Sequence, residues 1–546
     1  MSEPSAPEMR WWGWGSDDRA SALPEHAEAL LRAELQTDGR RRAPVALEQL
    51  TLAPSRLKGA GRDVLARALG SDGVREDRLA RVIHAAGKSY PDLVRVRSGQ
   101  MTGAPDGVLY PSTPEQVQAV LTACAEARIA VVPFGGGTSV VGGVDPAAGE
   151  HSAVVALDLR GLAVLVSVDV DSLTAVVQAG MRGPALEREL ARWGLTLGHF
   201  PQSFEYVSVG GCVATRSAGQ ASTGYGRIDE LVLGLRCCCP SGEIALPARP
   251  ASAAGPDLRQ LVVGSEGVLG VITEVSLRLH RRPETRRYEG LFFRSFTEGA
   301  QAFRHAVQED LAPDIARLSD ESETRLSLAL AGREGLKARL GETYLGARGY
   351  AGGCLAIVGW EGTEADVDRR RAGALALLTR HGALRLGASP GHSWAESRFA
   401  GPYLRDELLD RRIMADTLET AAQWSDIEAL HAAVASALKE SLGERGTPPL
   451  VMCHISHLYE SGASLYFTIL ARQEPEAEIE QWQAAKRAAS EAIVARTATI
   501  THHHGIGRDH VPWLEAETGP VGLAALRAAK QALDPAGIMN PGKLLG

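Results

Sequence analysis

A glycine triplet directly after an apolar run most constrains how this chain can fold. Residues 129–133 are apolar and have the length of a buried strand. The loop that follows comprises Pro133, Phe134, Gly135, Gly136, Gly137, Thr138 and Ser139. Consecutive glycines allow positive φ angles, and their N–H groups can then surround phosphate oxygens. Because the loop is neither a Walker motif nor a Rossmann fingerprint, an anion-binding turn and a flexible loop both stay open.

Length and composition describe a folded protein with more than one domain. The 546 residues exceed one typical domain, and 45% hydrophobic with 23% charged residues exclude a disordered or fibrous chain. The net charge of -8 offers no footprint for nucleic acid. No apolar run reaches the ~20 residues of a membrane helix, and the N-terminus carries no export signal. We therefore expect a cytoplasmic protein.

The seven cysteines indicate a reducing compartment rather than a disulfide framework. Their number is odd and their spacing irregular. Cys237, Cys238 and Cys239 are adjacent, so a strand would turn them to alternate faces, whereas zinc sites prefer a Cys-x-x-Cys spacing. The triplet therefore favours a buried strand over a metal site.

The apolar pattern predicts an α+β chain in four segments. Residues 1–100 contain helical segments broken by Pro and Gly, and residues 101–282 contain short strands and glycine loops. Residues 283–500 combine helices, the clearest at 366–381 and 478–496, with a strand pair at 450–457 and 464–470. Residues 501–546 form a separate C-terminal segment.

Two further loops and the C-terminus carry a family resemblance. The second loop and its following turn comprise Gln202, Ser203, Phe204, Glu205, Tyr206, Val207, Ser208, Thr215, Arg216, Ser217 and Ala218. The third comprises Glu266, Gly267, Val268, Leu269, Gly270, Val271 and Ile272. With the first loop and Leu-Asp-Pro-Ala-Gly-Ile-Met-Asn-Pro-Gly-Lys at 533–543, they resemble the vanillyl-alcohol-oxidase and p-cresol-methylhydroxylase flavoprotein superfamily. The resemblance implies FAD bound by all three loops, a two-subdomain FAD-binding domain over 101–282, and an α+β substrate cap over 283–500. It also implies that residues 501–546 are an active-site segment that returns to the FAD domain.

Other residues select a branch of this superfamily. Its 2-hydroxy-acid dehydrogenases carry Thr-Asn-Ala-Gly-Gly, where this chain has Thr-Arg-Ser-Ala-Gly at 215–219. The motif Arg-Trp-Trp-Gly-Trp-Gly at 10–15, the Thr-Arg turn and a triple histidine at 502–504 instead resemble the alkylglycerone-phosphate synthase (alkyl-dihydroxyacetonephosphate synthase) family. The resemblance extends from this aromatic motif to the C-terminus.

The triple histidine has three readings. His502 and His504 share one face of an extended segment, which suits a metal, but no further ligand motif accompanies them. An imidazole near neutrality also suits proton transfer, and a polar surface loop is the third reading. The resemblance places His502, His503 and His504 at the active site, which favours acid–base chemistry.

Tyr466 and two arginines complete the match. Tyr466 matches the family's catalytic tyrosine, although an inward tyrosine on a strand is otherwise part of the core. Tyr459, at the expected turn, is interpreted as unrelated to catalysis. Arg317 matches an arginine that supports charge near the reacting centre, and Arg405 matches one that holds a phosphate. His454 stands where the family commonly has an arginine.

The resemblance implies an FAD-dependent transferase without net redox change. It would exchange the acyl group of 1-acyl-dihydroxyacetone phosphate for a long-chain alcohol through a flavin N5 adduct, forming an ether-lipid precursor. Tyr466 would remove the C1 proton, and the histidines would tune Tyr466 and relay protons. An FAD-linked 2-hydroxy-acid dehydrogenase is the alternative, and a flavin-binding protein without catalysis is a second one. The lipid substrate motivates a peripheral membrane contact, and a homodimer stays open.

Overall fold

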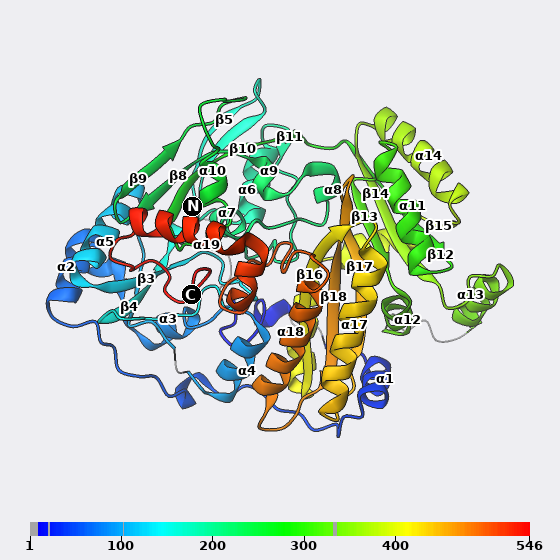
Figure 1. Ribbon diagram of the computed structural model, residues 1–546, viewed down its shortest axis with the longest axis horizontal. Coiled ribbons are helices and arrows are strands. Elements are labelled where there is room, and N and C mark those ends of the chain that lie inside the picture. Colours follow the sequence, from blue (N-terminus) through cyan, green and yellow to red (C-terminus); the bar gives the residue numbers. More distant parts are fainter. Residues whose placement is uncertain (1–8, 20–21, 102, 331–335) are drawn as a thin grey trace.

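The computed structural model describes residues 9–19, 22–101, 103–330 and 336–546 (Figure 1). Residues 1–8 and 20–21 of the predicted N-terminal segment lie outside the described residues. One lobe contains three small sheets, and the other contains a seven-stranded sheet with helices against it.

Two sheets of the first lobe position the glycine loops. The four-stranded sheet has the order β1 (Val74–Arg75), β2 (Gly107–Leu109), β4 (Ala153–Asp158), β3 (Ile129–Phe134). The glycine triplet follows the buried end of β3 directly. Its neighbour, a five-stranded antiparallel sheet, has the order β5 (Leu165–Asp169), β6 (Thr174–Gln178), β10 (Val271–Arg278), β8 (Val232–Cys239), β9 (Gly242–Leu246).

Strand β8 separates two hydrophobic cores. Cys237 and Cys239 face the core of the five-stranded sheet, while Cys238 packs in the core of helix α5 (Pro114–Ala127). Side chains alternate between the faces of a strand, so one run of three cysteines serves both cores. All seven cysteines are buried and unpaired, which confirms the buried-strand interpretation of the triplet.

The second lobe is built on an antiparallel sheet. Its order is β15 (Leu384–Gly387), β12 (Thr285–Phe293), β14 (Cys354–Gly362), β13 (Ile315–Ser319), β17 (Leu450–Leu458), β18 (Gly462–Arg472), β16 (Ile413–Gln423). Helices α11 (Phe296–Gln308), α14 (Glu364–Arg380), α17 (Ile427–Glu444) and α18 (Glu478–Val494) share a hydrophobic core with this sheet (Figure 1). The predicted strand pair and the predicted helices at 366–381 and 478–496 are confirmed within two residues at each end.

Alternation along β18 separates core from cavity. Leu465 and Phe467 are fully buried in the core shared with the helices. Tyr466 and Thr468 point to the opposite face, which lines a cavity between the lobes. The seven-stranded sheet therefore presents a polar face to the glycine loops.

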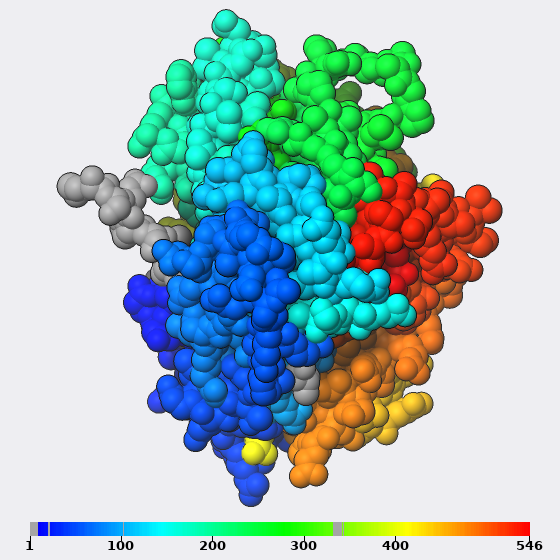
Figure 2. All heavy atoms as spheres, turned by 90° about the vertical axis from the view of Figure 1, so that its left-hand side faces the viewer, coloured from blue at the N-terminus to red at the C-terminus, as the bar shows by residue number. Residues whose placement is uncertain are grey.

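The C-terminal segment contacts both lobes. Helix α19 (Leu514–Leu533) precedes a stretch in which the N–H of Val131 donates to the Ile538 carbonyl at 2.8 Å. In Figure 2 this segment, in red, lies against both the first lobe and the orange end of the second. No helix among the described residues is long and apolar enough to span a membrane.

The core of the second lobe gives a stability prediction. Phe303 on α11 is fully buried and packs edge-on against Phe293 of β12, with ring centroids 6.3 Å apart. Phe303→Ala should lower the free energy of unfolding of this lobe by about 3–5 kcal/mol, because it leaves a cavity in a packed core. Denaturant unfolding measures this. The exposed Leu79→Ala serves as control and should change it by less than about 0.5 kcal/mol; equal effects would contradict the prediction.

Candidate active site

A cavity of about 530 Å³ lies between the glycine loops and the polar face of the seven-stranded sheet. The first lobe contributes mainly loop backbone, and the second lobe contributes side chains. The predicted catalytic and substrate residues that line the cavity are Arg317, Arg405, Tyr466, His503 and His504. His502 lies behind them, 5% exposed.

The first glycine loop forms a cradle of backbone donors. All seven of its predicted residues line the cavity. A Cβ on Gly136 would collide with the Tyr206 carbonyl, so only glycine lets this loop approach its neighbour. Among the described hydrogen bonds, none takes the N–H of Gly136, Gly137 or Thr138 as donor. These donors fit the diphosphate of a dinucleotide cofactor.

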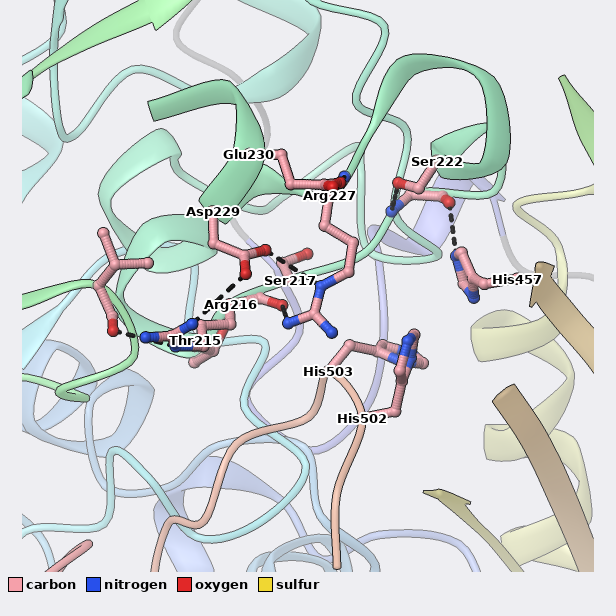
Figure 3. A network of polar contacts seen from close by, with 12 residues as sticks. Thr215, Arg216, Ser217, Ser222, Arg227, Asp229, Glu230, His457, His502 and His503 are labelled. Atoms are coloured by element: carbon pink, nitrogen blue, oxygen red, sulfur yellow. Dashed lines mark hydrogen bonds and ion pairs between the residues drawn. The ribbon is translucent and has the colours of Figure 1, made fainter. Parts of the chain in front are cut away.

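The second loop is divided between the cavity and the protein interior. Ser208 begins helix α7 (Val209–Thr215), and its hydroxyl accepts the Gly211 N–H at 3.2 Å. The Arg216 side chain instead turns toward Asp229, 3.4 Å away (Figure 3). Gln202, Ser203, Val207, Ser208, Thr215, Ser217 and Ala218 line the cavity, whereas the contacts of Phe204, Glu205, Tyr206 and Arg216 are with other parts of the protein.

The third loop binds the C-terminal segment. The Glu266 carboxylate accepts the N–H groups of Ile506 and Gly507 at 2.6 and 2.7 Å. Burial raises the pKa of Glu266 to about 7 despite these bonds. Four residues of this loop line the cavity: Glu266, Gly267, Gly270 and Ile272. The other three, Val268, Leu269 and Val271, are buried and do not line it.

The Glu419 carboxylate positions the three histidines. Its Oε1 accepts the backbone N–H groups of residues 502–504 at 3.1, 2.8 and 2.6 Å, and its Oε2 lies 2.8 Å from His504 Nδ1. Burial opposes the charge, but the charge and hydrogen bonding of His504 outweigh it and hold the pKa of Glu419 well below its ordinary value. Sequence reasoning missed Glu419 because it lies 83 residues before His502.

The imidazoles bond to each other. His502 Nδ1 lies 2.9 Å from His503 Nδ1, and burial together with the neighbouring histidines lowers the pKa of both rings well below the ordinary value. Both rings are therefore neutral, and their Nδ1 atoms are occupied by each other rather than open to a metal. The set with metal-ligand spacing that the described residues do offer lies elsewhere, on α11 and at the end of α14: His305, Glu309 and His381.

Tyr466 lies opposite Glu419 of β16 and His454 of β17 in the sheet. Its ring stacks on those of His454 and His503, with centroids 4.9 and 6.0 Å away. Burial raises the pKa of Tyr466 to about 12, so the phenol is protonated at neutral pH. Its described contacts with the histidines are between rings, and ionisation requires a cation nearby.

Arg317, which is half-buried, supplies that cation and pairs with the buried Glu323 and His454. Its Nη1 lies 3.0 Å from His454 Nε2, and its guanidinium pairs with Glu323. Glu323 Oε2 in turn lies 3.0 Å from His454 Nδ1. Burial opposes the charge of Glu323, but His454 and Arg317 outweigh it and lower its pKa to about 2. Sequence reasoning missed Glu323, which is recognisable only as an acidic residue in the first turn of α12 (Glu321–Leu330).

Arg405 on α16 (Gly401–Asp410) has unused donor capacity. Its Nη1 donates to the Lys88 carbonyl at 2.7 Å, while its buried Nε has no described partner. The Lys88 ammonium donates to the Arg10 carbonyl at 2.7 Å, which anchors the aromatic N-terminal motif beside Arg405. Trp14 of that motif also lines the cavity. An arginine with a spare donor at a cavity wall suits an anionic ligand.

One arm of the cavity is apolar. It lies between α12, α16 and the strands β16–β18, next to the core that includes helix α1 (Glu25–Leu35). Its lining includes Leu326, Leu330, Leu404, Leu408, Met452 and Leu470. The sequence had no pattern that marked this arm, because its residues come from four elements.

Comparison with known proteins decides the family. A model of the FAD binding domain matches residues 105–245, and one of the C-terminal domain of FAD linked oxidases matches residues 282–544. An alkyldihydroxyacetonephosphate synthase of Trypanosoma brucei brucei is 34% identical, over 98% of this chain and 92% of its own length. The chain belongs to the alkyldihydroxyacetonephosphate synthase family. A Dictyostelium discoideum member is 33% identical over 87% of this chain and 79% of its own.

Solved structures agree with this family. An alkyldihydroxyacetonephosphate synthase matches with a TM-score of 0.85 and 29% identity, over 98% of this chain and 99% of its own. A p-cresol methylhydroxylase, 16% identical with a TM-score of 0.66 over 92% and 98% of the chains, shares the fold. The predicted family, α+β fold with a vanillyl-alcohol-oxidase-type FAD domain, and FAD as cofactor are confirmed.

The bonds of Glu419 to residues 502–504, called the Glu419 clamp, give a pH-dependent prediction. Glu419→Gln should lower the free energy of unfolding at pH 7 by about 3–5 kcal/mol, because it breaks a buried pair and several hydrogen bonds. Since the folded protein depresses the pKa of Glu419, the wild-type advantage exists above the ordinary glutamate pKa of ~4.3 and shrinks as the pH falls through lower values. Thermal unfolding from pH 7 to pH 3 measures this.

The control for this prediction is Glu428→Gln, which changes an exposed glutamate on α17. It should change stability by less than about 0.5 kcal/mol. A Glu419→Gln deficit that stayed constant over the whole pH range would contradict the clamp.

Proposed function

We propose that this chain exchanges the acyl group of 1-acyl-dihydroxyacetone phosphate for a long-chain alcohol and so forms an ether bond. One observation carries the proposal: a single cavity joins the glycine cradle, a half-buried arginine with one described hydrogen bond and an apolar arm. A substrate with a phosphate at one end and an aliphatic chain at the other satisfies all three surfaces.

Arg405 holds the phosphate in this proposal. A guanidinium remains charged when buried and presents planar donors that match phosphate oxygens. Among the described hydrogen bonds, only the Lys88 carbonyl accepts from the Arg405 guanidinium, so a phosphate can meet its remaining Nη donors without breaking a protein hydrogen bond. The apolar arm then receives the acyl or alkyl chain, where it is removed from water.

Tyr466 removes the proton from C1, which is acidified by the neighbouring ketone. Burial raises the pKa of the Tyr466 phenol, and the Thr417 side chain and the Arg317 cation oppose this rise. Arg317 also stabilises negative charge that develops on the ketone oxygen. His454 and Glu323 keep Arg317 in place. His503 and His504 flank the Tyr466 ring and exchange protons with it through the cavity.

The N–H groups of Gly136, Gly137 and Thr138 hold the FAD diphosphate. When bound, FAD supplies the nucleophilic nitrogen for the exchange without net redox change. The apolar arm excludes water, so that an alcohol rather than water reaches the reacting carbon. The residues thus favour ether formation over hydrolysis.

A 2-hydroxy-acid dehydrogenase is the alternative. A Bacillus subtilis glycolate oxidase subunit is 25% identical over 82% of this chain. Small hydroxy acids do not use the apolar arm, and the Thr-Arg-Ser-Ala-Gly turn at 215–219 departs from that branch. The deciding assay is the conversion of acyl-dihydroxyacetone phosphate and labelled hexadecanol to labelled alkyl-dihydroxyacetone phosphate, with release of the fatty acid. Anaerobic flavin reduction by a hydroxy acid, without hexadecanol incorporation, would overturn the proposal.

Tyr466→Phe tests the proton acceptor. It should lower hexadecanol incorporation at least ~100-fold, because general acid–base steps contribute that much, while FAD binding remains. The matched control is Tyr350→Phe, whose hydroxyl donates to the Gly382 carbonyl at 2.8 Å outside the cavity. Retained activity in Tyr466→Phe would remove this residue from the mechanism.

Arg405→Met tests phosphate recognition. It should raise the KM for acyl-dihydroxyacetone phosphate about 10- to 100-fold, since a hydrogen bond to a charged group contributes about 1.5–3 kcal/mol. Arg445→Met, which removes a partly exposed ion pair with Glu474, is the control and should leave the KM unchanged. A substrate without the phosphate should have the same high KM with wild type and with Arg405→Met. If Arg405→Met still bound the phosphorylated substrate more tightly than the dephosphorylated one by the wild-type factor, the phosphate would lie elsewhere.

A lipid substrate also motivates a peripheral membrane contact. Cytoplasmic location, this contact and a homodimer stay predictions. Co-sedimentation with phospholipid vesicles and light scattering of the purified protein measure the last two.

A further inference from the structure

Hydrogen-bonded side chains lead from the cavity to the far end of strand β17. His503 lines the cavity, and its Nδ1 lies 2.9 Å from His502 Nδ1. On the other side of the same ring, His502 Nε2 lies 2.6 Å from the Tyr459 hydroxyl. Tyr459 is half-buried and lies at the turn between β17 and β18, outside the cavity lining. The sequence interpretation had set Tyr459 aside.

Backbone contacts hold each member of this series in place. Glu419 accepts the N–H groups of both His502 and His503. The Tyr459 carbonyl accepts the Trp424 indole N–H at 3.0 Å, and its own N–H donates to the Gly462 carbonyl at 2.9 Å. The second lobe and the C-terminal segment together therefore hold these rings at short distances from each other.

Arg227 faces the outer end of the series from the first lobe. Arg227 lies close enough to Tyr459 to oppose the rise that burial causes in the pKa of its phenol, and the guanidinium is held by Asp229, 3.0 Å away (Figure 3). Burial and the neighbouring histidines lower the pKa of both His502 and His503, and the positive charge of Arg227 lowers both further. Both imidazoles are therefore neutral, and each has one N–H and one unprotonated nitrogen. That state can pass a proton in either direction.

His457 is a neighbour rather than a member. Its ring centroid lies 5.0 Å from that of His502. Its Nε2 lies 2.9 Å from the Gly219 carbonyl and therefore carries the ring's proton. Its Nδ1 lies 3.2 Å from the Ser464 hydroxyl. Figure 3 shows the ring turned toward Ser222. Burial lowers the pKa of His457 to about 4.

We propose that His503, His502 and Tyr459 form a proton relay between the cavity and solvent. The relay rests on the proposed function, in which an ester and an alcohol give an ether, a carboxylate and one proton. That proton must leave a cavity from which water is excluded. A proton taken up at His503 Nε2 releases the Nδ1 proton to His502 Nδ1. His502 then gives its Nε2 proton to Tyr459, which releases its hydroxyl proton outward, so that one proton enters and one leaves.

Tyr459→Phe removes the outer oxygen and keeps the ring. In weakly buffered solution it should lower kcat for hexadecanol incorporation about 10- to 100-fold and leave the KM unchanged, because a proton-transfer step becomes slow. Added imidazole should restore the rate, since it carries the proton in place of Tyr459. Tyr350→Phe is the matched control and should behave as wild type.

Each outcome decides the relay. An unchanged kcat overturns it, and so does a loss that imidazole does not restore, which would indicate a structural role. A wild type without any incorporation defeats the proposed function, and nitrogen-15 NMR of labelled histidines then tests the relay separately. Tyr459→Phe must shift the imidazole resonances of both His502 and His503; a shift confined to His502 overturns the relay.

Discussion

The structure of the active site depends on two buried carboxylates that bind backbone rather than ligand. Glu419, from the cap, holds the N–H groups of residues 502–504, and Glu266, from the first lobe, holds those of residues 506 and 507. One short segment thus spans two lobes through these hydrogen bonds, and those to Glu419, whose pKa is depressed, are charge-assisted and stronger than neutral ones. Because Glu419 binds the histidines and Glu266 binds the residues directly after them, the positions of the imidazole rings depend on how the two lobes are arranged.

Much of the fold could be predicted from the sequence because its signals are local. The glycine triplet after β3, the strand pair β17–β18 and the cysteine run in β8 are each readable within a dozen residues. The family and its cofactor also followed from loops whose glycines permit close backbone approach.

The rest of the site depends on partners that are distant in the chain. Glu419 meets the histidines across 83 residues, and Glu323 meets His454 across 131. The pattern of apolar and polar residues along the sequence does not indicate such distant pairs. Tyr459 was dismissed because a turn suggests a surface role, yet its hydroxyl lies 2.6 Å from His502. For Glu205, Arg216 and the Glu266 side chain, a loop motif indicated FAD contact, whereas their described bonds are to the protein.

The register of the three strands β16, β17 and β18 has an evolutionary consequence. Glu419, His454 and Tyr466 lie side by side across these strands, while Leu465 and Phe467 fill the core behind them. A shift of one residue in any strand exchanges its two faces, burying the polar set in the core and exposing the apolar one. Point substitutions can therefore vary this face gradually, but a single insertion or deletion within one of the strands turns that strand's member of the set, Glu419, His454 or Tyr466, away from the cavity. Descendants of this chain should differ here in side chains and keep the strand lengths.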